Sequence, residues 1–229
     1  MPSFPKQVLV AARESPLSKA QFSEVQSALR QHHPQIELIP RWISTTGDRN
    51  LQISLRSLGK TDFFTKEVDE LLLTHACQVA IHSAKDLPEV IPEGLNLVAL
   101  TQGLDPRDVI VLRPNEAFET LKKGAVIATS SERREERVQA LRTDLQFIDL
   151  RGTIEQRIDF LFTGEADGVV VAEAALQRLG LVSLNRFYLP GETTPFQGQL
   201  AIMARSDDQV MNELFYCLDS RQVCHASST

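Results

Sequence analysis

The sequence contains few cysteines, no long apolar run and no excess of positive charge. The three cysteines, Cys77, Cys217 and Cys224, form no CxxC pair and no ligand spacing with histidine, so we expect neither a disulfide framework nor a structural metal site. No window approaches the roughly 20 apolar residues of a membrane span. The net charge of -6 argues against general attraction to nucleic acid or an anionic membrane, so any bound anion needs a local cluster of cations.

The remaining composition is that of an ordinary globular protein. Of the 229 residues, 42% are hydrophobic and 24% are charged, which is enough to bury a substantial core. The first ten residues are too short and too polar for a secretory signal, so we expect a cytoplasmic protein. Cys77 follows the apolar run Leu71–Leu73 and is predicted to be a buried structural thiol.

Apolar runs and helical periodicity alternate through the first hundred residues. Ser15 and Pro16 are typical of a helix start, and apolar side chains then recur at helical spacing to about Arg30. We predict strands at 7–12, 36–44, 79–82 and 95–100, helices at 16–30 and 65–75, and a polar turn at 45–48. This order predicts a sheet with helices on both faces.

The same pattern begins again after a polar crossing. We predict strands at 109–112, 125–128, 147–150 and 168–171, helices at 131–142, 153–162 and 172–179, and a last helix at 208–223 with Val210, Leu214, Cys217 and Leu218 on its inner face. The predicted fold is α/β, with two lobes like those of periplasmic receptors and a ligand cleft between them. The first lobe is 1–101 plus about 198–229, where the last helix returns. The second lobe is 106–195, and the crossings lie near 101–108 and 190–198.

Two turns of the first lobe carry candidate site residues. Lys85 and Asp86 follow the apolar run Val79–Ile81, and in open α/β sheets ligands bind at the carboxyl ends of the strands. A strand end with a solvated lysine and aspartate explains this stretch equally well. Arg13 lies between a strand and the helix that Ser15 caps, where backbone donors and a guanidinium favour a carboxylate.

Two turns of the second lobe bring cations together. Thr129–Arg134 follows a buried strand and opens a helix, so hydroxyls, backbone N–H groups and two guanidiniums converge on an anion site. In the next turn, Arg151 precedes a capping box formed by Thr153 and Gln156, and Arg157 lies one helical turn further on. The alternative is that Arg133 and Arg134 pair with the neighbouring glutamates or lie on a solvated helix face.

These segments resemble one family. The stretches that carry the resemblance are His82–Pro88, Asp105–Asp108, Thr129–Arg134, Leu150–Thr153, Arg13–Leu17, Thr46–Asp48 and Gln197–Gly198. In this order and spacing they resemble the porphobilinogen deaminase (hydroxymethylbilane synthase) family over residues 7 to about 215. The resemblance implies a monomeric transferase of tetrapyrrole (haem) biosynthesis. It would join four porphobilinogen molecules head to tail on a covalent dipyrromethane primer and release ammonia each time.

The resemblance also implies roles for particular residues. Asp86 would be the catalytic carboxylate that stabilises a positively charged pyrrole intermediate. The residues that would hold the dipyrromethane are Arg13, Ser15, Lys85, Ser131, Arg133, Arg134, Arg151 and Arg157. The residues that would contact substrate are Arg13, Lys60, Arg151 and Arg157. The guanidiniums suit the acetate and propionate groups that each pyrrole carries.

The sequence departs from the family pattern in two places. The segment 59–67, where the family has a glycine-rich loop with a lysine, is one residue longer and lacks a glycine after Lys60. The chain also stops about thirty residues after Gln197, where the family continues into a domain with the cysteine that anchors the primer. We hypothesise that Cys224 takes over this attachment, with an idle tail cysteine as the alternative, while Cys217 is expected in the core. A non-catalytic binder of pyrroles or other carboxylated ligands is the competing function.

Overall fold

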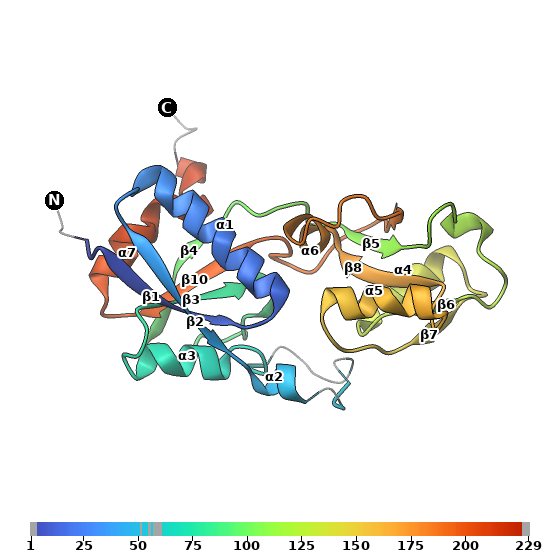
Figure 1. Cartoon of the computed structure of the whole chain (residues 1–229), viewed down its shortest axis with the longest axis horizontal. Helices are drawn as coiled ribbons and strands as arrows, with labels where there is room; N and C mark the ends of the chain where they lie inside the picture. The colour runs from blue at the N-terminus through green and yellow to red at the C-terminus, as the bar shows by residue number, and fades with distance from the viewer. Residues whose placement is uncertain (1–3, 51, 55, 57–60, 226–229) are drawn as a thin grey trace. The chain divides into compact units, whose positions relative to one another are not determined.

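The computed structural model describes residues 4–50, 52–54, 56 and 61–225, with side chains to residue 222. The chain divides into two compact units (Figure 1). Unit 1 is Met1–Arg49, Lys60–Gly103 and Gln199–Thr229, and unit 2 is Asn50–Gly59 and Leu104–Gly198. Residues 50–59, which the sequence-based prediction assigned to the first lobe, group with unit 2. Within that segment, Arg56 donates to the carbonyl oxygen of Thr129 at 2.9 Å and pairs with Glu135 at 2.8 Å.

Unit 1 is built on a five-stranded sheet in the order β2-β1-β3-β10-β4. Its elements are β1 Gln7–Arg13, α1 Pro16–His32, β2 Glu37–Ile43, α2 Thr46–Arg49, α3 Lys66–Leu73, β3 Val79–Ser83, η2 Ala84–Asp86, β4 Leu95–Leu100, β10 Leu200–Arg205, α7 Gln209–Phe215, η4 Tyr216–Leu218 and η5 Ser220–His225. β1 pairs in parallel with β2 and β3, whereas β10 is antiparallel to β3 and β4. The polar turn predicted at 45–48 overlaps the one-turn helix α2.

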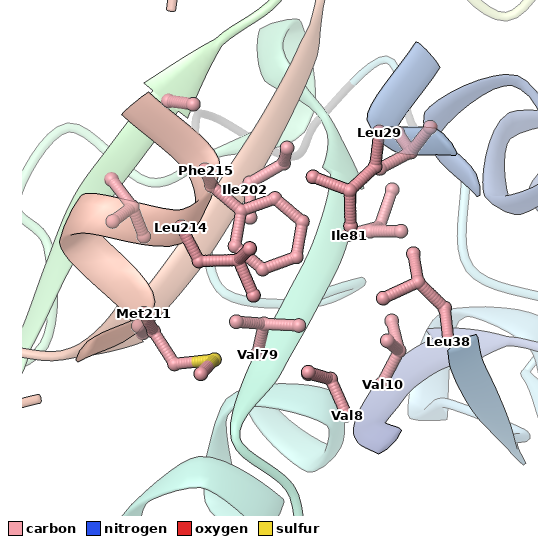
Figure 2. Packing of buried hydrophobic residues seen from close by; sticks show 14 of the residues in the cluster. Val8, Val10, Leu29, Leu38, Val79, Ile81, Ile202, Met211, Leu214 and Phe215 are labelled. Carbon is pink, nitrogen blue, oxygen red and sulfur yellow. The ribbon is translucent and has the colours of Figure 1, made fainter. Parts of the chain in front are cut away.

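Helices cover both faces of this sheet, as predicted (Figure 1). Successive strand residues point to opposite faces. On one face, Val79 and Ile81 of β3 pack with Leu29 of α1 and Phe215 of α7 (Figure 2). On the other face, Ala80 of the same strand packs in the cluster that contains the inner side of α3 and Cys77. The alternation along β3 therefore fixes the strand between two separate packing layers.

Unit 2 has a second five-stranded sheet, in the order β7-β6-β8-β5-β9. Its elements are β5 Asp108–Val111, η3 Phe118–Thr120, β6 Val126–Ala128, α4 Glu132–Leu141, β7 Gln146–Ile148, α5 Ile154–Thr163, β8 Gly168–Ala172, α6 Glu173–Arg178 and β9 Arg186–Tyr188. β6 is parallel to β7 and β8, and β5 is antiparallel to β8 and β9. One face packs against α5 and the other against Val138 of α4. The described residues therefore form two sheet-and-helix units of one α/β class.

The C-terminal segment returns to unit 1, but the prediction of one helix at 208–223 is wrong. The α-helix ends at Phe215 and two 3₁₀ segments follow it. Val210 is 39% exposed, whereas Met211, Leu214 and Phe215 are buried, because the three- and four-residue spacing that faces the sheet begins at Met211. Beyond the helix, hydrogen bonds to the end of β4 hold the chain, among them Ser220 Oγ to the Leu100 carbonyl oxygen at 2.7 Å.

Strands β9 and β10 were not predicted. Leu200–Ala204 of β10 is buried throughout, so this central strand has a continuous apolar run instead of an alternating pattern. None of the helices in the described part of the chain is long and apolar enough to cross a bilayer.

Candidate functional site

In unit 1, the predicted site residues gather at one edge of the sheet. β1 and β3 are adjacent and parallel, with Ala11 opposite Ala80, so Arg13 and Ser83 end their strands at the same edge. The helix start at Ser15 and the turn at Lys85 and Asp86 follow directly from these strand ends. The carboxyl ends of parallel strands are the usual position of ligand sites in such sheets.

Asp86 lies on a short, well-anchored turn. β3 is buried up to His82, and the chain then makes the single 3₁₀ turn Ala84–Asp86. The backbone N–H of Ala84 donates to the carbonyl oxygen of Gln199 at 3.0 Å, and that of Leu87 donates to Ala84 at 3.3 Å. Ala84 is buried whereas Lys85 and Asp86 are half-buried. The turn therefore presents a carboxylate and an ammonium group at the surface of a rigid strand end.

Below this turn, a buried pair that the sequence analysis missed holds the end of β3. His82 Nε2 lies 2.9 Å from Asp69 Oδ1 of α3, and both side chains are at most 4% exposed. Ser83 Oγ accepts a hydrogen bond from Gln21 Nε2 of α1 at 2.8 Å. Side chains from helices on both faces of the sheet thus fix the residues that precede Asp86.

Arg13 is held by a carboxylate and an aromatic ring. Its Nε donates to Asp48 Oδ2 at 3.2 Å, its Nη2 donates to Asp48 Oδ1, and its guanidinium carbon lies 4.5 Å from the centroid of the Phe64 ring. Thr45 donates to Asp48 from its backbone N–H at 3.0 Å and its hydroxyl at 2.8 Å. Burial alone would raise the pKa of Asp48, but Arg13 and Thr45 outweigh it and hold that pKa below its ordinary value.

Gly47 makes room for this arrangement. A Cβ at Gly47 would lie 2.2 Å from Cε1 of Phe64, which is far inside van der Waals contact. The Thr46–Asp48 segment therefore contributes the carboxylate that binds Arg13, and its glycine leaves space for the Phe64 ring against which the guanidinium packs. The position of Asp48 in the sequence, three residues after Thr45, was a possible signal for this role because such pairs form local side-chain to backbone turns.

In unit 2, the hydroxyl-rich turn after β6 lies where the sequence predicted it. Thr129 is completely buried, its hydroxyl accepts from the N–H of Ser131 at 3.3 Å, and the Ser130 hydroxyl donates to the carbonyl oxygen of Leu150. Ser131 is the N-cap of α4 without a side-chain capping bond. The turn leads from β6 into α4, and the Ser130 hydrogen bond links it to the segment that follows the parallel neighbour β7.

Arg133 and Arg134 share one buried carboxylate, which is Asp108 instead of the neighbouring glutamates. Arg133 Nη2 lies 2.6 Å from Asp108 Oδ2, and Arg134 donates to Asp108 Oδ1 from Nε at 3.0 Å and Nη2 at 2.6 Å. The side chain of Asp108 is 1% exposed. Burial alone would raise its pKa, but the charges and hydrogen bonds of the arginines outweigh this and lower the pKa from 3.8 to about 2.

The next turn carries Arg151 and Arg157 in a fixed backbone frame. The predicted capping box is confirmed: Thr153 N–H donates to Gln156 Oε1 at 2.9 Å, and Gln156 N–H donates to Thr153 Oγ1 at 3.3 Å. Arg157 Nε donates to the carbonyl oxygen of Gly152 at 2.9 Å. Arg151 lies three residues beyond the end of β7 and is half-buried.

Two predicted site residues cannot be placed. Lys60 and the side chain of Cys224 lie outside the described residues. Cys77 is 1% exposed, as predicted, and Cys217 is half-buried against the core of unit 1. Burial raises the pKa of both thiols, which makes them poor nucleophiles.

Solved structures identify the class of fold. The methionine-binding protein MetQ is similar with a TM-score of 0.56 at 13% identity, over 93% of this chain and 89% of that chain. The reduced regulatory domain of OxyR2 from Vibrio vulnificus is similar with a TM-score of 0.53 at 13% identity, over 95% of this chain and 96% of that chain. The chain is therefore an α/β protein of the periplasmic-binding-protein type, with polar residues at the carboxyl edges of its sheets.

Sequence relatives identify the family. The family model described as porphobilinogen deaminase, dipyromethane cofactor binding domain, matches residues 8–213. The chain belongs to the porphobilinogen deaminase family. The porphobilinogen deaminase of Desulforudis audaxviator is 39% identical over 217 residues, 93% of this chain and 70% of the relative. That of Syntrophomonas wolfei is 38% identical over 203 residues, 87% of this chain and 66% of the relative. The chain thus spans about two thirds of the length of these relatives.

Proposed function

We propose that this chain is a hydroxymethylbilane synthase, which condenses four porphobilinogen molecules head to tail on a dipyrromethane primer and releases ammonia at each step. The observation that carries the proposal is the edge of unit 1, where the half-buried carboxylate of Asp86 follows a strand parallel to the one that ends at Arg13. A family of pyrrole-condensing enzymes supplies the substrate class. The product would enter tetrapyrrole biosynthesis.

Each of the two edges, taken by itself, has donors that suit the acetate and propionate groups of a dipyrromethane. Unit 2 supplies the guanidiniums of Arg133, Arg134, Arg151 and Arg157, the hydroxyl of Ser131 and the N–H groups at the start of α4. Unit 1 supplies Arg13, Ser15 and Lys85. Guanidinium groups pair with carboxylates through two parallel hydrogen bonds, so they both neutralise and orient such a ligand. When bound, the primer supplies the nucleophilic pyrrole carbon at which the chain grows.

Asp86 would act on the substrate pyrrole. Loss of ammonia from porphobilinogen leaves a cation whose positive charge reaches the pyrrole N–H. A fixed carboxylate that accepts this N–H stabilises the cation and the transition state that leads to it. The 3₁₀ turn, held through Ala84 and Gln199, keeps the carboxylate in place before the charge develops, so little reorganisation is needed.

The competing function is a binder that holds carboxylated pyrroles without turnover. Arginines and hydroxyls alone serve that function equally well. A carboxylate at Asp86 does not, because it repels the acetate and propionate groups of such a ligand. Its presence on the same edge as Arg13 favours the enzyme. Attachment of the primer through Cys224, a monomeric state and a cytoplasmic location stay predictions.

The test is a condensation assay on the purified chain. Wild-type protein incubated with porphobilinogen should yield a linear tetrapyrrole that loses water and closes to uroporphyrinogen, which is then oxidised chemically to uroporphyrin and measured by absorbance. Asp86→Asn removes the charge with little change in shape, and it should lower the rate at least about 100-fold, as loss of a transition-state electrostatic contact does. Glu89→Gln, at an exposed carboxylate three residues further on, is the matched control and should keep full activity. Wild-type protein that binds pyrroles and forms no uroporphyrin would support the binder instead.

A further inference from the structure

We propose that Asp108 is a positioning residue that holds the guanidinium groups of Arg133 and Arg134 in the orientation in which they bind a ligand carboxylate. This inference rests on the proposed function, which makes the two arginines ligands of the pyrrole side chains. A buried carboxylate inside a site for carboxylates is otherwise unfavourable, because like charges repel.

Strand direction brings Asp108 to the site. Asp108 is the first residue of β5, which runs antiparallel to β8 with Asp108 opposite Ala172. β6 and β8 are parallel, so the start of β5 lies at the edge where these strands end. The carboxylate therefore reaches the start of α4 from the chain segment that enters unit 2.

The contacts select one edge of each guanidinium. A single oxygen, Asp108 Oδ1, accepts from both Nε and Nη2 of Arg134, which are the two donors on one side of the planar fork. This contact directs the Nη1 side of Arg134 away from Asp108. Arg133 is held at two points as well, by Asp108 at 2.6 Å from Nη2 and by the carbonyl oxygen of Glu192 at 3.1 Å from Nη1. Both side chains are thereby restrained before any ligand arrives.

The positive charges of Arg133 and Arg134 explain why a carboxylate is suited to hold the two guanidiniums together. Without Asp108, two adjacent guanidiniums would repel each other and separate into solvent. One carboxylate between two arginines cancels the repulsion and still leaves a formal charge of +1 for the cluster. The site therefore remains attractive to an anion while its donors stay in place.

Gln197 in turn fixes Asp108. Its Nε2 donates to Asp108 Oδ1 at 2.8 Å and to the carbonyl oxygen of Pro106 at 2.6 Å, and its side chain belongs to a residue that is 4% exposed. Asp108 thus has partners on both oxygens and cannot rotate away from the arginines without breaking several buried hydrogen bonds. This contact also explains the Gln197–Gly198 segment, which had no assigned role in the sequence analysis.

The experiment is a double-mutant cycle on ligand affinity, measured by calorimetry. The probe is a pyrrole that carries acetate and propionate but no aminomethyl group, so it binds without condensing. We expect Arg134→Gln and Asp108→Asn each to weaken binding about tenfold, the loss typical of a hydrogen bond between charged groups. If Asp108 acts through the arginines, the double variant should lose clearly less than the hundredfold product of the two. Asp105→Asn, in the same segment but paired with Arg107, is the matched control and should bind as wild type.

Three outcomes of the binding experiment would overturn the inference. A hundredfold loss in the double variant would show that Asp108 acts independently, and unchanged binding in Asp108→Asn would show that it has no role in positioning. Wild-type protein that binds no probe would overturn the proposed function and the inference with it.

A second experiment uses wild-type protein only, so it tests the inference even where a variant fails to fold. The Nε proton of Arg134 should exchange with water at least about tenfold more slowly than that of exposed Arg30, because its hydrogen bond must open first. Equal exchange rates would also contradict the inference.

Discussion

Acid should lower the unfolding free energy of unit 2 because Asp108 becomes protonated. The arginines lower the pKa of this carboxyl from 3.8 to about 2 in the folded chain. A lowered folded-state pKa contributes stability that is present above the unfolded value and is lost as the pH falls toward the folded value. The shift corresponds to about 2 kcal/mol of unfolding free energy at neutral pH. Because Asp108 is 1% exposed, solvent screens this contribution little.

The size of the effect can be measured in an accessible pH range. Linkage between the two pKa values implies that about 1 kcal/mol of the contribution is lost between pH 5 and pH 3. Asp108→Asn has no carboxyl to protonate, so the difference in unfolding free energy between wild type and variant should shrink by about 1 kcal/mol over this range. Urea unfolding followed by far-ultraviolet circular dichroism at several pH values measures it.

The control is a carboxyl without such a partner set. Asp207 is 82% exposed and lies 3.8 Å from Arg205, so Asp207→Asn should change the unfolding free energy by less than about 0.5 kcal/mol. A difference for Asp108→Asn that is as large at pH 3 as at pH 5 would refute the reasoning. In that case the arginines would not hold the ionised carboxylate in the folded chain.

Two further changes test the core and the edge of unit 1. Phe215→Ala removes a fully buried ring and should lower the unfolding free energy by about 3 to 5 kcal/mol in urea unfolding, whereas Tyr216→Ala, at a residue 62% exposed, should change it by less than about 0.5 kcal/mol. Equal effects would contradict the packing of α7. Gly47→Ala should cost about 1 to 3 kcal/mol by overpacking against the Phe64 ring, and by displacing that ring under Arg13 it should raise KM in the condensation assay. An unchanged KM would show that the ring has no part in holding Arg13.

Local signals in the sequence were sufficient for most helices and strands. Ser15 before Pro16 predicted the start of α1, and Ser15 Oγ does accept from the N–H of Ser18 at 3.2 Å. The Thr153 and Gln156 pair predicted a capping box in the same way. Such caps involve residues three positions apart, so the sequence alone contains both partners.

Signals that depend on distant partners were not visible. β10 pairs with strands more than a hundred residues earlier in the chain, and a buried apolar run by itself does not distinguish a central strand from another buried segment. The end of the C-terminal helix was also missed. There the Asp219 carboxylate accepts a hydrogen bond from the N–H of Leu100, and the Ser220 hydroxyl donates to the Leu100 carbonyl oxygen, so the chain follows the end of β4 instead of continuing as a helix.

The charges of the candidate site also depend on partners that are distant in the sequence. The sequence predicted Arg13, Arg133 and Arg134 as cations for ligand carboxylates. From the sequence alone, each of these arginines counts as one full positive charge. In the structure, Asp48 forms an ion pair with Arg13, and Asp108 forms ion pairs with Arg133 and Arg134. These carboxylates neutralise part of the positive charge and already accept hydrogen bonds from several of the guanidinium N–H groups. Ligand carboxylates would meet arginines whose orientation is fixed and whose net attraction is reduced. Because both carboxylates reach their arginines through non-local pairing of chain segments, only the three-dimensional arrangement could reveal this balance.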